Sequence, residues 1–323
     1  MEMNSLSNMR RNSFIVVGRA GLDLYADPPG VEIEDATKFS AALGGSAANI
    51  AVSIARQGGS AALWSAVSSD AIGHYTVKSL KSYGVDTRFV KYVGGQARNS
   101  LAIVETRSEN CQSVIYRNDA ADFQVTEIEA KVMDYSAFAA IIVTGTSLAL
   151  EPSRSATLTA MQLARDAGLM VIIDIDYRPY SWASRAEAQR VCLKASEMCD
   201  ILVGNDDEFA VLAGAQNGLL LATQLANRPG RIVVYKMGPK GCITFANGTR
   251  FDTPIFSVTA LKPTGAGDGF MGGFICGLAA GAPLPEALRR GAATAAIVVT
   301  RVGCAPAMPN AAEVHAFMLK AQD

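Results

Sequence analysis

A single carboxylate, Asp268, ends the run Thr264-Gly265-Ala266-Gly267-Asp268. The three residues before it have little or no side chain, so their backbone N–H groups can approach an anion closely. The apolar stretch from Phe270 to Ala280 suits a helix, and a helix beginning near Gly265 would direct free amides and its positive dipole end at a phosphate. Asp268 repels phosphate, but it can accept a proton from a hydroxyl that attacks the phosphate. In isolation, the run also fits a turn in which Asp268 is a helix N-cap.

A glycine pair, Gly44-Gly45, opens a second predicted helix, which continues through Ile50 to Arg56. Adjacent glycines let the backbone approach a bound polar molecule. Asn49, on the first turn of this helix, can both donate and accept hydrogen bonds. Tight packing of the helix explains the same glycines equally well, so the pair alone does not establish a binding site.

Polar residues from Asp174 to Trp182 follow a predicted strand. In open α/β sheets, ligands bind beyond the carboxyl ends of the strands, where these residues would lie. Arg178 within this stretch could bind a carboxylate or a phosphate through two hydrogen bonds. The alternative is a surface loop with a local Asp–Arg ion pair.

The acidic run Asn205-Asp206-Asp207-Glu208 follows another predicted strand. Clustered acids suit Mg²⁺, which is usually held through water and by the phosphates of the substrate. The same residues fit a helix start with Asn205 as N-cap and Glu208 completing a capping box. Both interpretations can hold at once.

The run Lys236-Met237-Gly238-Pro239-Lys240-Gly241 closes a further strand with a glycine-rich turn. Such a turn could border a nucleotide, although many turns between strands look alike. The chain has no G-x-x-x-x-G-K-[ST] sequence, which excludes a standard P-loop.

The composition predicts a compact folded protein, because 50% of the 323 residues are hydrophobic and 18% are charged. The formal net charge is −1, so no overall field favours nucleic acid or an anionic membrane as a partner. The six cysteines include no C-x-x-C pair and there are only two histidines, so we expect free thiols and no Cys/His zinc site. The stretch Phe14 to Gly18 reads as a first strand and not as a signal peptide, and we expect a cytoplasmic protein.

Short β-branched runs alternate with helical patterns along the chain, which predicts a mostly parallel sheet with helices on both faces. The strand-like runs are 141–144, 171–174, 201–203 and 232–234, and the helical patterns are 153–167, 185–198, 208–212 and 219–226. Segments 22–40 and 95–123 interrupt this alternation with Pro, Gly and Asn, and we interpret them as β-segments that form a lid. No linker or repeat divides residues 1–323, so we expect one domain.

Taken in order, the motifs resemble those of the ribokinase-like (PfkB-type) carbohydrate kinases over essentially the whole chain. The matching residues are Gly18 with Asp23, Gly44-Gly45 with Asn49, Asn205 with Glu208 as N-x-x-E, and Gly265 to Asp268. The resemblance implies an α/β, ribokinase-like fold: a central, mostly parallel sheet flanked by helices, with a small β-lid. It also implies an ATP- and Mg²⁺-dependent kinase, and it allows a monovalent cation such as K⁺ and a homodimer formed through the lids.

The resemblance also implies roles for individual residues. Asp268 would be the catalytic base, and the anion hole for the γ-phosphoryl group would comprise Gly265, Ala266 and Gly267. Sugar hydroxyls would be bound by Asp23, Gly44, Gly45 and Asn49, and ATP by Asn205, Lys236, Gly238 and Gly241. Glu208 would hold Mg²⁺ through water.

A narrower set of residues, including 18–25, 174–182 and 303–309, resembles members of the family that phosphorylate a primary hydroxyl of a keto-deoxy sugar acid. A sugar acid would give Arg178 and Arg117 an anionic partner. The chain departs from the family pattern at Pro263, where a second Thr is common, and at Asp176, which is a less close match to ketodeoxygluconate kinases. The alternatives are a kinase of the same fold for ketodeoxygluconate, fructose or a nucleoside, and a sensor that binds sugar or nucleotide without turnover.

Overall fold

Nine strands form the large sheet, in the order β13-β12-β11-β10-β9-β8-β1-β4-β5. The computed structural model describes residues 4–320. Pairing is parallel from β5 to β11, and only the β11-β12-β13 edge is antiparallel. The strands are β1 (Ser13–Val17), β4 (Ser60–Ser68), β5 (Val90–Val93), β8 (Ala140–Thr144), β9 (Met170–Asp174), β10 (Ile201–Asn205), β11 (Ile232–Lys236), β12 (Cys242–Ala246) and β13 (Thr249–Thr253).

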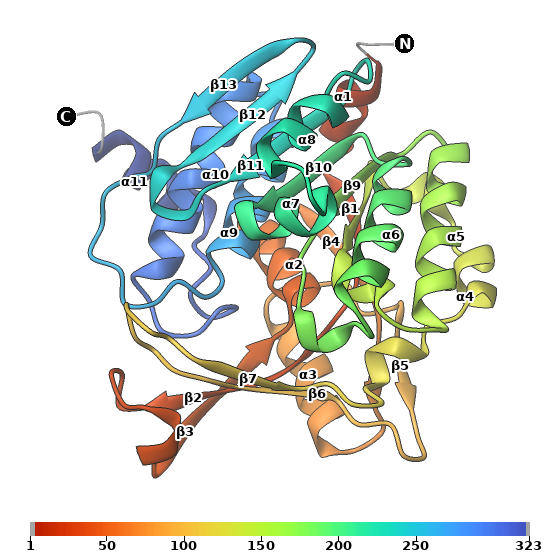
Figure 1. Ribbon diagram of the computed structural model, residues 1–323. Coiled ribbons are helices and arrows are strands. Elements are labelled where there is room, and N and C mark those ends of the chain that lie inside the picture. Colours follow the sequence, from red (N-terminus) through yellow and green to blue (C-terminus); the bar gives the residue numbers. More distant parts are fainter. Residues whose placement is uncertain (1–3, 321–323) are drawn as a thin grey trace.

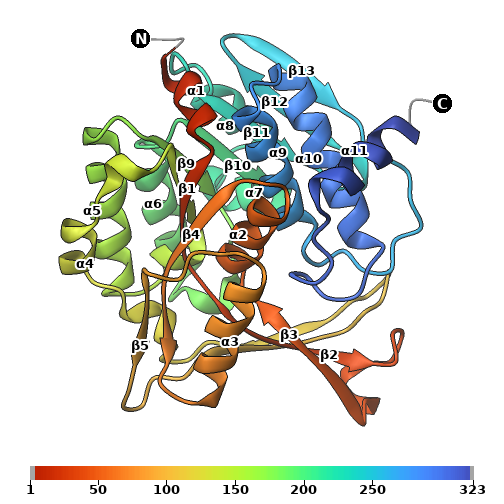
Figure 2. The ribbon, with the colours of Figure 1, turned by 180° about the vertical axis from the view of Figure 1, so that it is seen from behind.

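Helices cover both faces of this sheet (Figures 1 and 2). The apolar residues of α2, α3, α9 and α10 belong to one buried cluster, and those of α4 to α8 belong to a second. Their bounds, with those of the remaining helices, are α1 (Asn4–Asn8), α2 (Ser46–Arg56), α3 (Ala71–Ser82), α4 (Glu127–Val132), α5 (Ser153–Asp166), α6 (Arg185–Ser196), α7 (Asp206–Ala213), α8 (Gly218–Leu225), α9 (Ala266–Ala279), α10 (Leu284–Val299) and α11 (Ala311–Lys320).

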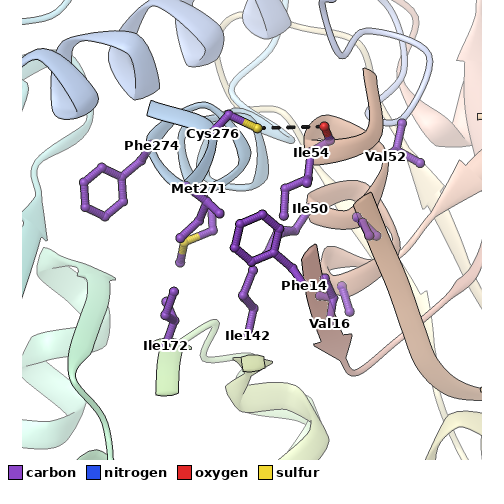
Figure 3. Close-up of a cluster of buried hydrophobic side chains, with 14 of the residues drawn as sticks. Phe14, Val16, Ile50, Val52, Ile54, Ile142, Ile172, Met271, Phe274 and Cys276 are labelled. Carbon is purple, nitrogen blue, oxygen red and sulfur yellow. Dashed lines mark hydrogen bonds between the residues drawn. The ribbon is translucent and has the colours of Figure 1, made fainter. Parts of the chain in front are cut away.

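Strand β1 shows how the two clusters arise. Successive side chains of a strand point to opposite faces of the sheet. Phe14 and Val16 therefore lie in the cluster with α2 and α9, beside Ile50 and Met271 (Figure 3). The alternate residues Ile15 and Val17 lie in the cluster of the opposite face. Because both faces are covered, all of these residues are apolar, as expected for a buried parallel strand.

Helix α9 is apolar on nearly all sides and lies very close to its neighbours. A Cβ on Gly272 would lie 2.2 Å from the Oγ of Ser53 in α2. A Cβ on Gly273 would lie 2.3 Å from the Oγ1 of Thr294 in α10. Glycine at these positions lets the helix backbones approach, so the packing fixes where the first turn of α9 lies.

The small sheet has four strands in the order β3-β2-β6-β7 and projects from one side of the large sheet (Figure 1). Its strands are β2 (Gly21–Asp27), β3 (Lys38–Gly44), β6 (Ser100–Val104) and β7 (Ser113–Tyr116). They come from the two segments that interrupt the alternation, although β3 extends four residues beyond Ser40. The strand pairing of β3 with β2 continues to Gly44, so the small sheet leads directly into the glycine pair before α2.

The fold class predicted from the sequence is confirmed, since a mostly parallel sheet between helices carries a smaller β-sheet. The helical patterns correspond to α5, α6, α7 and α8 within two residues at each end. Within residues 4–320, none of the helices combines the length and apolar character that crossing a bilayer requires.

Candidate active site

A cavity of about 350 Å³ lies between the small sheet, the first turns of α2 and α9, and the loop after β9. Six of the predicted site residues line it, namely Asp23, Asn49, Arg117, Arg178, Gly265 and Asp268. Nine do not, namely Gly44, Gly45, Ala266, Gly267, Asn205, Lys236, Glu208, Gly238 and Gly241. The structure therefore brings together residues that are up to 245 positions apart in the chain.

Asp268 lies in the first turn of α9 but does not cap it. The helix begins at Ala266, and its N-cap is Gly265, whose φ of +82° is in the left-handed region that glycine adopts readily. A Cβ on Gly265 would also lie 3.0 Å from the Sγ of Cys304. The free N–H groups of the first turn and the carboxylate of Asp268 therefore lie at the same helix end.

The surroundings of Asp268 raise the pKa of its carboxyl group toward neutral pH. Its Oδ2 accepts a hydrogen bond of 2.8 Å from Nδ2 of Asn49. Burial and the negative charge of Asp176 raise the pKa of Asp268 to about 7, although the bond from Asn49 opposes this shift. A pKa near the working pH is what general-base catalysis favours.

Lys236 lies beneath the predicted anion hole. A Cβ on Gly267 would lie 3.3 Å from the Nζ of Lys236, and the same Nζ lies 3.6 Å from Oδ1 of Asp174. Burial lowers the pKa of Lys236, but the carboxylates of Asp174 and Glu208 outweigh that effect and raise it overall. The side chain is therefore a charged ammonium beside the first turn of α9.

The run Asn205 to Glu208 forms the predicted capping box at the start of α7. Oδ1 of Asn205 accepts from N of Glu208 at 2.8 Å, and Oε2 of Glu208 accepts from N of Asn205 at 2.7 Å. The other carboxylate oxygen of Glu208 accepts from N of Tyr177 at 3.2 Å. Burial raises the pKa of Glu208 to about 7. Glu208 thus joins the end of β10 to the loop after β9.

Four carboxylates, those of Asp174, Asp176, Glu208 and Asp268, all act on Lys236 electrostatically. The cations that act on this group of acids include Lys236, Arg178 and, on Asp268, Lys262, so the acids outnumber these cations. This excess of acid fits a divalent cation. Within residues 4–320, no group of three or more His, Cys, Asp and Glu side chains forms a metal site, so Mg²⁺ would depend largely on phosphate oxygens and water.

Within residues 4–320, four buried polar atoms of the residues that line the cavity have no hydrogen-bond partner: the hydroxyls of Ser181 and Thr264, and two carbonyl-type acceptors, one on Asp23 and one on Asn49. One oxygen of Asp23 accepts from the hydroxyl of Tyr25 at 3.0 Å, whereas its Oδ1 is buried and unpaired. Oδ1 of Asn49 is also buried and unpaired. Buried acceptors without partners are uncommon in folded proteins, and hydroxyl groups of a sugar would satisfy both.

The glycine pair makes room for these acceptors. A Cβ on Gly44 would lie 1.9 Å from Oδ1 of Asp23, so only glycine leaves that oxygen space. Gly45 has a φ of +102°, and its Cβ would lie 2.4 Å from the backbone oxygen of Arg19. Both glycines therefore shape the cavity wall beside Asp23 and Arg19, although neither lines the cavity.

The two predicted arginines differ in how completely ion pairs and hydrogen bonds within the protein already occupy their guanidinium groups. Arg178 pairs with Asp176 at 2.8 Å, which is the local ion pair that the sequence left open, but its side chain is 44% exposed at the cavity. Arg117 pairs with Asp122, donates to the backbone oxygen of Thr146 at 3.0 Å, and is only 3% exposed. Arg178 thus has donors free for an anion, whereas Arg117 is largely neutralised.

Asp176, noted in the sequence as a departure from the family pattern, has a φ of +38° and accepts hydrogen bonds from the hydroxyls of Ser46 and Thr146. Ser46, Thr146 and Arg19 line the cavity but do not stand out in the sequence, because their partners are distant in the chain. Thr146 follows β8, so the rule that polar residues gather after parallel strands could have identified it. Arg19 also lines the cavity, and within the described part of the chain no carboxylate lies within 4.0 Å of its guanidinium.

The turn between β11 and β12 contains Gly238 and Gly241, with φ values of +53° and +83°. This turn joins antiparallel strands at the end of β11 that carries Lys236. Its own geometry requires both glycines, so a nucleotide contact stays a prediction here.

Comparisons with known proteins identify the family of this chain. The sequence pattern of the pfkB family carbohydrate kinase matches residues 11–311. A 5-dehydro-2-deoxygluconokinase from Photobacterium profundum is 36% identical over 302 residues, which cover 92% of this chain and 91% of that relative.

Solved structures share the fold. A fructokinase with bound ATP from Xylella fastidiosa has a TM-score of 0.85 at 24% identity, covering 97% of this chain and all of that one. A fructokinase double mutant from Vibrio cholerae O395, in a form with bound fructose, ADP and potassium ion, has a TM-score of 0.83 at 25% identity, covering 94% of this chain and 98% of that one. With a family match that spans nearly the whole chain, and with an acid placed at a helix N-terminus beside a polar cavity, this protein belongs to the pfkB family of carbohydrate kinases.

Proposed function

We propose that this chain transfers the γ-phosphoryl group of ATP to the 6-hydroxyl of 5-dehydro-2-deoxy-D-gluconate. The relative at 36% identity is named for that activity. The observation that carries the proposal is the position of Asp268. Its carboxylate shares one cavity with unpaired acceptors on Asp23 and Asn49 and with two partly exposed arginines, Arg19 and Arg178.

In the proposed reaction, Asp268 accepts the proton of the 6-hydroxyl as its oxygen attacks the γ-phosphorus. Negative charge then grows on the phosphoryl oxygens, where the N–H groups of Gly265, Ala266 and Gly267 would stabilise it. The N–H of Ala266 also donates a long bond of 3.4 Å to the backbone oxygen of Pro263, which it would exchange for the phosphoryl group. Lys236 adds positive charge beside the same turn. When bound, Mg²⁺ neutralises charge on the phosphates of ATP, and Glu208 with its neighbours would hold it through water.

The small sheet supplies the sugar side of the site. Asp23 on β2 and Asn49 on α2 would accept hydrogen bonds from sugar hydroxyls through oxygens that otherwise have no partner. We propose that residues 1–323 act as one domain in which segments 22–40 and 95–123 form a lid over this site. Closure of such a lid would exclude water and limit hydrolysis of ATP.

The carboxylate of the substrate would bind to Arg178, assisted by Arg19. Arg178 is exposed to the cavity and has donors that its ion pair with Asp176 does not use. Arg117, expected as a second carboxylate ligand, would instead order the cavity wall through Asp122 and Thr146.

We also propose a homodimer formed through the small sheets, whose outer strands expose Phe39 and Tyr116. A cytoplasmic location is proposed because all six cysteines are unpaired, as thiols are in a reducing compartment.

A coupled ADP-release assay tests the function. The panel would contain 5-dehydro-2-deoxygluconate, 2-keto-3-deoxygluconate, fructose and a nucleoside, each with ATP and Mg²⁺. We expect the highest kcat/KM with 5-dehydro-2-deoxygluconate. A higher value for another acceptor would reassign the substrate, and binding without ADP release on every acceptor would favour a sensor.

A further inference from the structure

Lys262, three residues before Gly265, the N-cap of α9, is completely buried. Its Nζ donates hydrogen bonds to the backbone oxygens of Thr264 and Val298, the latter at 3.4 Å. Within residues 4–320, no carboxylate lies within 4.0 Å of this ammonium. A buried charge without a paired counter-ion is strongly unfavourable, so a lysine at this place calls for an explanation.

One of the two carbonyl partners lies where the helix dipole favours a positive charge, and the other lies at the start of α9. Val298 is in the last turn of α10, where backbone oxygens lack helical partners and the dipole is negative. Thr264 precedes Gly265, the N-cap of α9. Lys262 therefore joins the negative end of one helix to the loop that opens the positive end of another.

The bond to Thr264 also orients the anion hole. In a trans peptide unit, the carbonyl oxygen and the following N–H point in opposite directions. Because Lys262 holds the oxygen of Thr264, it directs the N–H of Gly265 away from itself. The N–H of Gly265 is one of the groups proposed to stabilise the transferring phosphoryl group.

Backbone carbonyl oxygens are also the ligands with which proteins replace the water around K⁺. An ammonium ion carries the same charge and has a similar size. The oxygens of Thr264 and Val298 are already bonded to Nζ of Lys262, so these two carbonyls are not free to hold a monovalent cation beside the anion hole. The family resemblance allows a monovalent cation, whereas these two carbonyls already have a cation of the chain itself as their partner.

We infer that Lys262 is a positioning residue whose tethered ammonium takes the place of a monovalent cation under the anion-hole loop, so that this kinase turns over without one. Burial lowers the pKa of Lys262, and the nearby thiols of Cys304 and Cys111 and carboxylates of Asp268 and Asp23 oppose that shift. The inference rests on phosphoryl transfer at the proposed site, but not on the identity of the sugar.

The first test needs no mutation. With whichever acceptor of the panel releases ADP, the rate of the wild-type enzyme is measured in tetramethylammonium, Na⁺ and K⁺ chlorides at equal ionic strength. We expect rates within about twofold of one another. Activation by K⁺ of about fivefold or more would overturn the inference. Absence of turnover in every salt would instead count against the proposed function, so the two failures are distinct.

The second test replaces Lys262 with alanine, which leaves space for an ion. Loss of an oxyanion-hole donor lowers kcat by about 10²–10³ in other enzymes, and misdirecting one should cost at least about tenfold. We expect Lys262→Ala in tetramethylammonium to lose kcat with an unchanged acceptor KM, and to regain activity in K⁺ or NH₄⁺. Lys81→Ala, at an exposed position of α3, is the matched control and should behave as wild type.

An unchanged kcat in Lys262→Ala, or a loss that neither K⁺ nor NH₄⁺ restores, would overturn the inference. The melting temperature gives a second readout that needs no substrate. Replacing tetramethylammonium with K⁺ should raise the melting temperature of Lys262→Ala and leave the melting temperature of the wild type unchanged. If the variant does not fold, the salt series on the wild type still decides.

Discussion

Asp268→Asn is the most informative substitution for the proposed mechanism. It keeps the shape of the side chain, and the amide oxygen can still accept the hydrogen bond that Nδ2 of Asn49 donates at 2.8 Å. It removes the group that accepts the proton. General-base catalysis is typically worth about 10²–10⁴-fold, so kcat should fall by at least that lower factor.

The same substitution should stabilise the protein. The pKa of Asp268 rises from the usual 3.8 to about 7 on folding, so ionising this group disfavours the native state wherever the pH exceeds the unfolded value. A shift of this size corresponds to at most roughly 4 kcal/mol, and partial exposure reduces it. The gain should be full above pH 7, decline between pH 7 and 4, and vanish below pH 4.

The pH profile follows from the same pKa. For the wild-type enzyme, kcat/KM should rise about tenfold between pH 6 and pH 7.5 as Asp268 loses its proton, because only the charged form accepts one. Steady-state ADP release gives the rates, and urea unfolding at pH 8 and pH 5 gives the free energies. Asp166→Asn, at an exposed position of α5, is the matched control.

Two results would refute this reasoning. If Asp268→Asn keeps more than about a tenth of the wild-type kcat, then Asp268 is not the base. If the variant is less stable than wild type at pH 8, the carboxylate contributes native interactions that outweigh its burial, and the raised pKa is wrong.

Three further substitutions test the surrounding site. Arg178→Ala should reduce kcat/KM for the sugar acid about tenfold or more while changing that for fructose little, and equal losses on both would remove Arg178 from carboxylate recognition. Asp23→Ala should raise the acceptor KM by roughly one to two orders of magnitude and leave the KM for ATP unchanged, since Asp23 lines the cavity and its Oδ1 has no hydrogen-bond partner. A selective rise in the KM for ATP would contradict the proposed role of Asp23 in binding the sugar. Glu208→Gln should increase the Mg²⁺ concentration needed for half-maximal rate several-fold, and an unchanged Mg²⁺ titration would show that Glu208 acts only as a cap.

Local signals in the sequence predicted the parts of the site that one segment builds alone. The capping box of Asn205 and Glu208 and the helix start at Gly265 depend on residues within four positions of each other. The alternation of strands and helices predicted the sheet because each strand is buried on both faces. Polar residues after β9 could be expected at the cavity because parallel strands end at one edge.

Contacts between distant segments could not be predicted in this way. The bond from Ser46 to Asp176 spans 130 positions, and no local pattern links them. Arg117 looked like a free cation, but Asp122 matches its charge through a turn whose conformation the sequence does not reveal. Lys262 beside a proline resembles a surface residue, and only the packing of α9 against α10 shows that it is enclosed.

The close contacts of α9 have a consequence for how activity can be lost. A methyl group on Gly277 would meet the backbone of Ala287 at 2.7 Å, although Gly277 lies nine residues, or about 13 Å along the axis, beyond Asp268. A helix held this tightly transmits a displacement along its length instead of absorbing it. A mutation can therefore inactivate this enzyme at a residue that contacts no ligand. A glycine-to-alanine substitution in α9 is usually considered conservative, but here we expect it to impair activity as a substitution in the active site would.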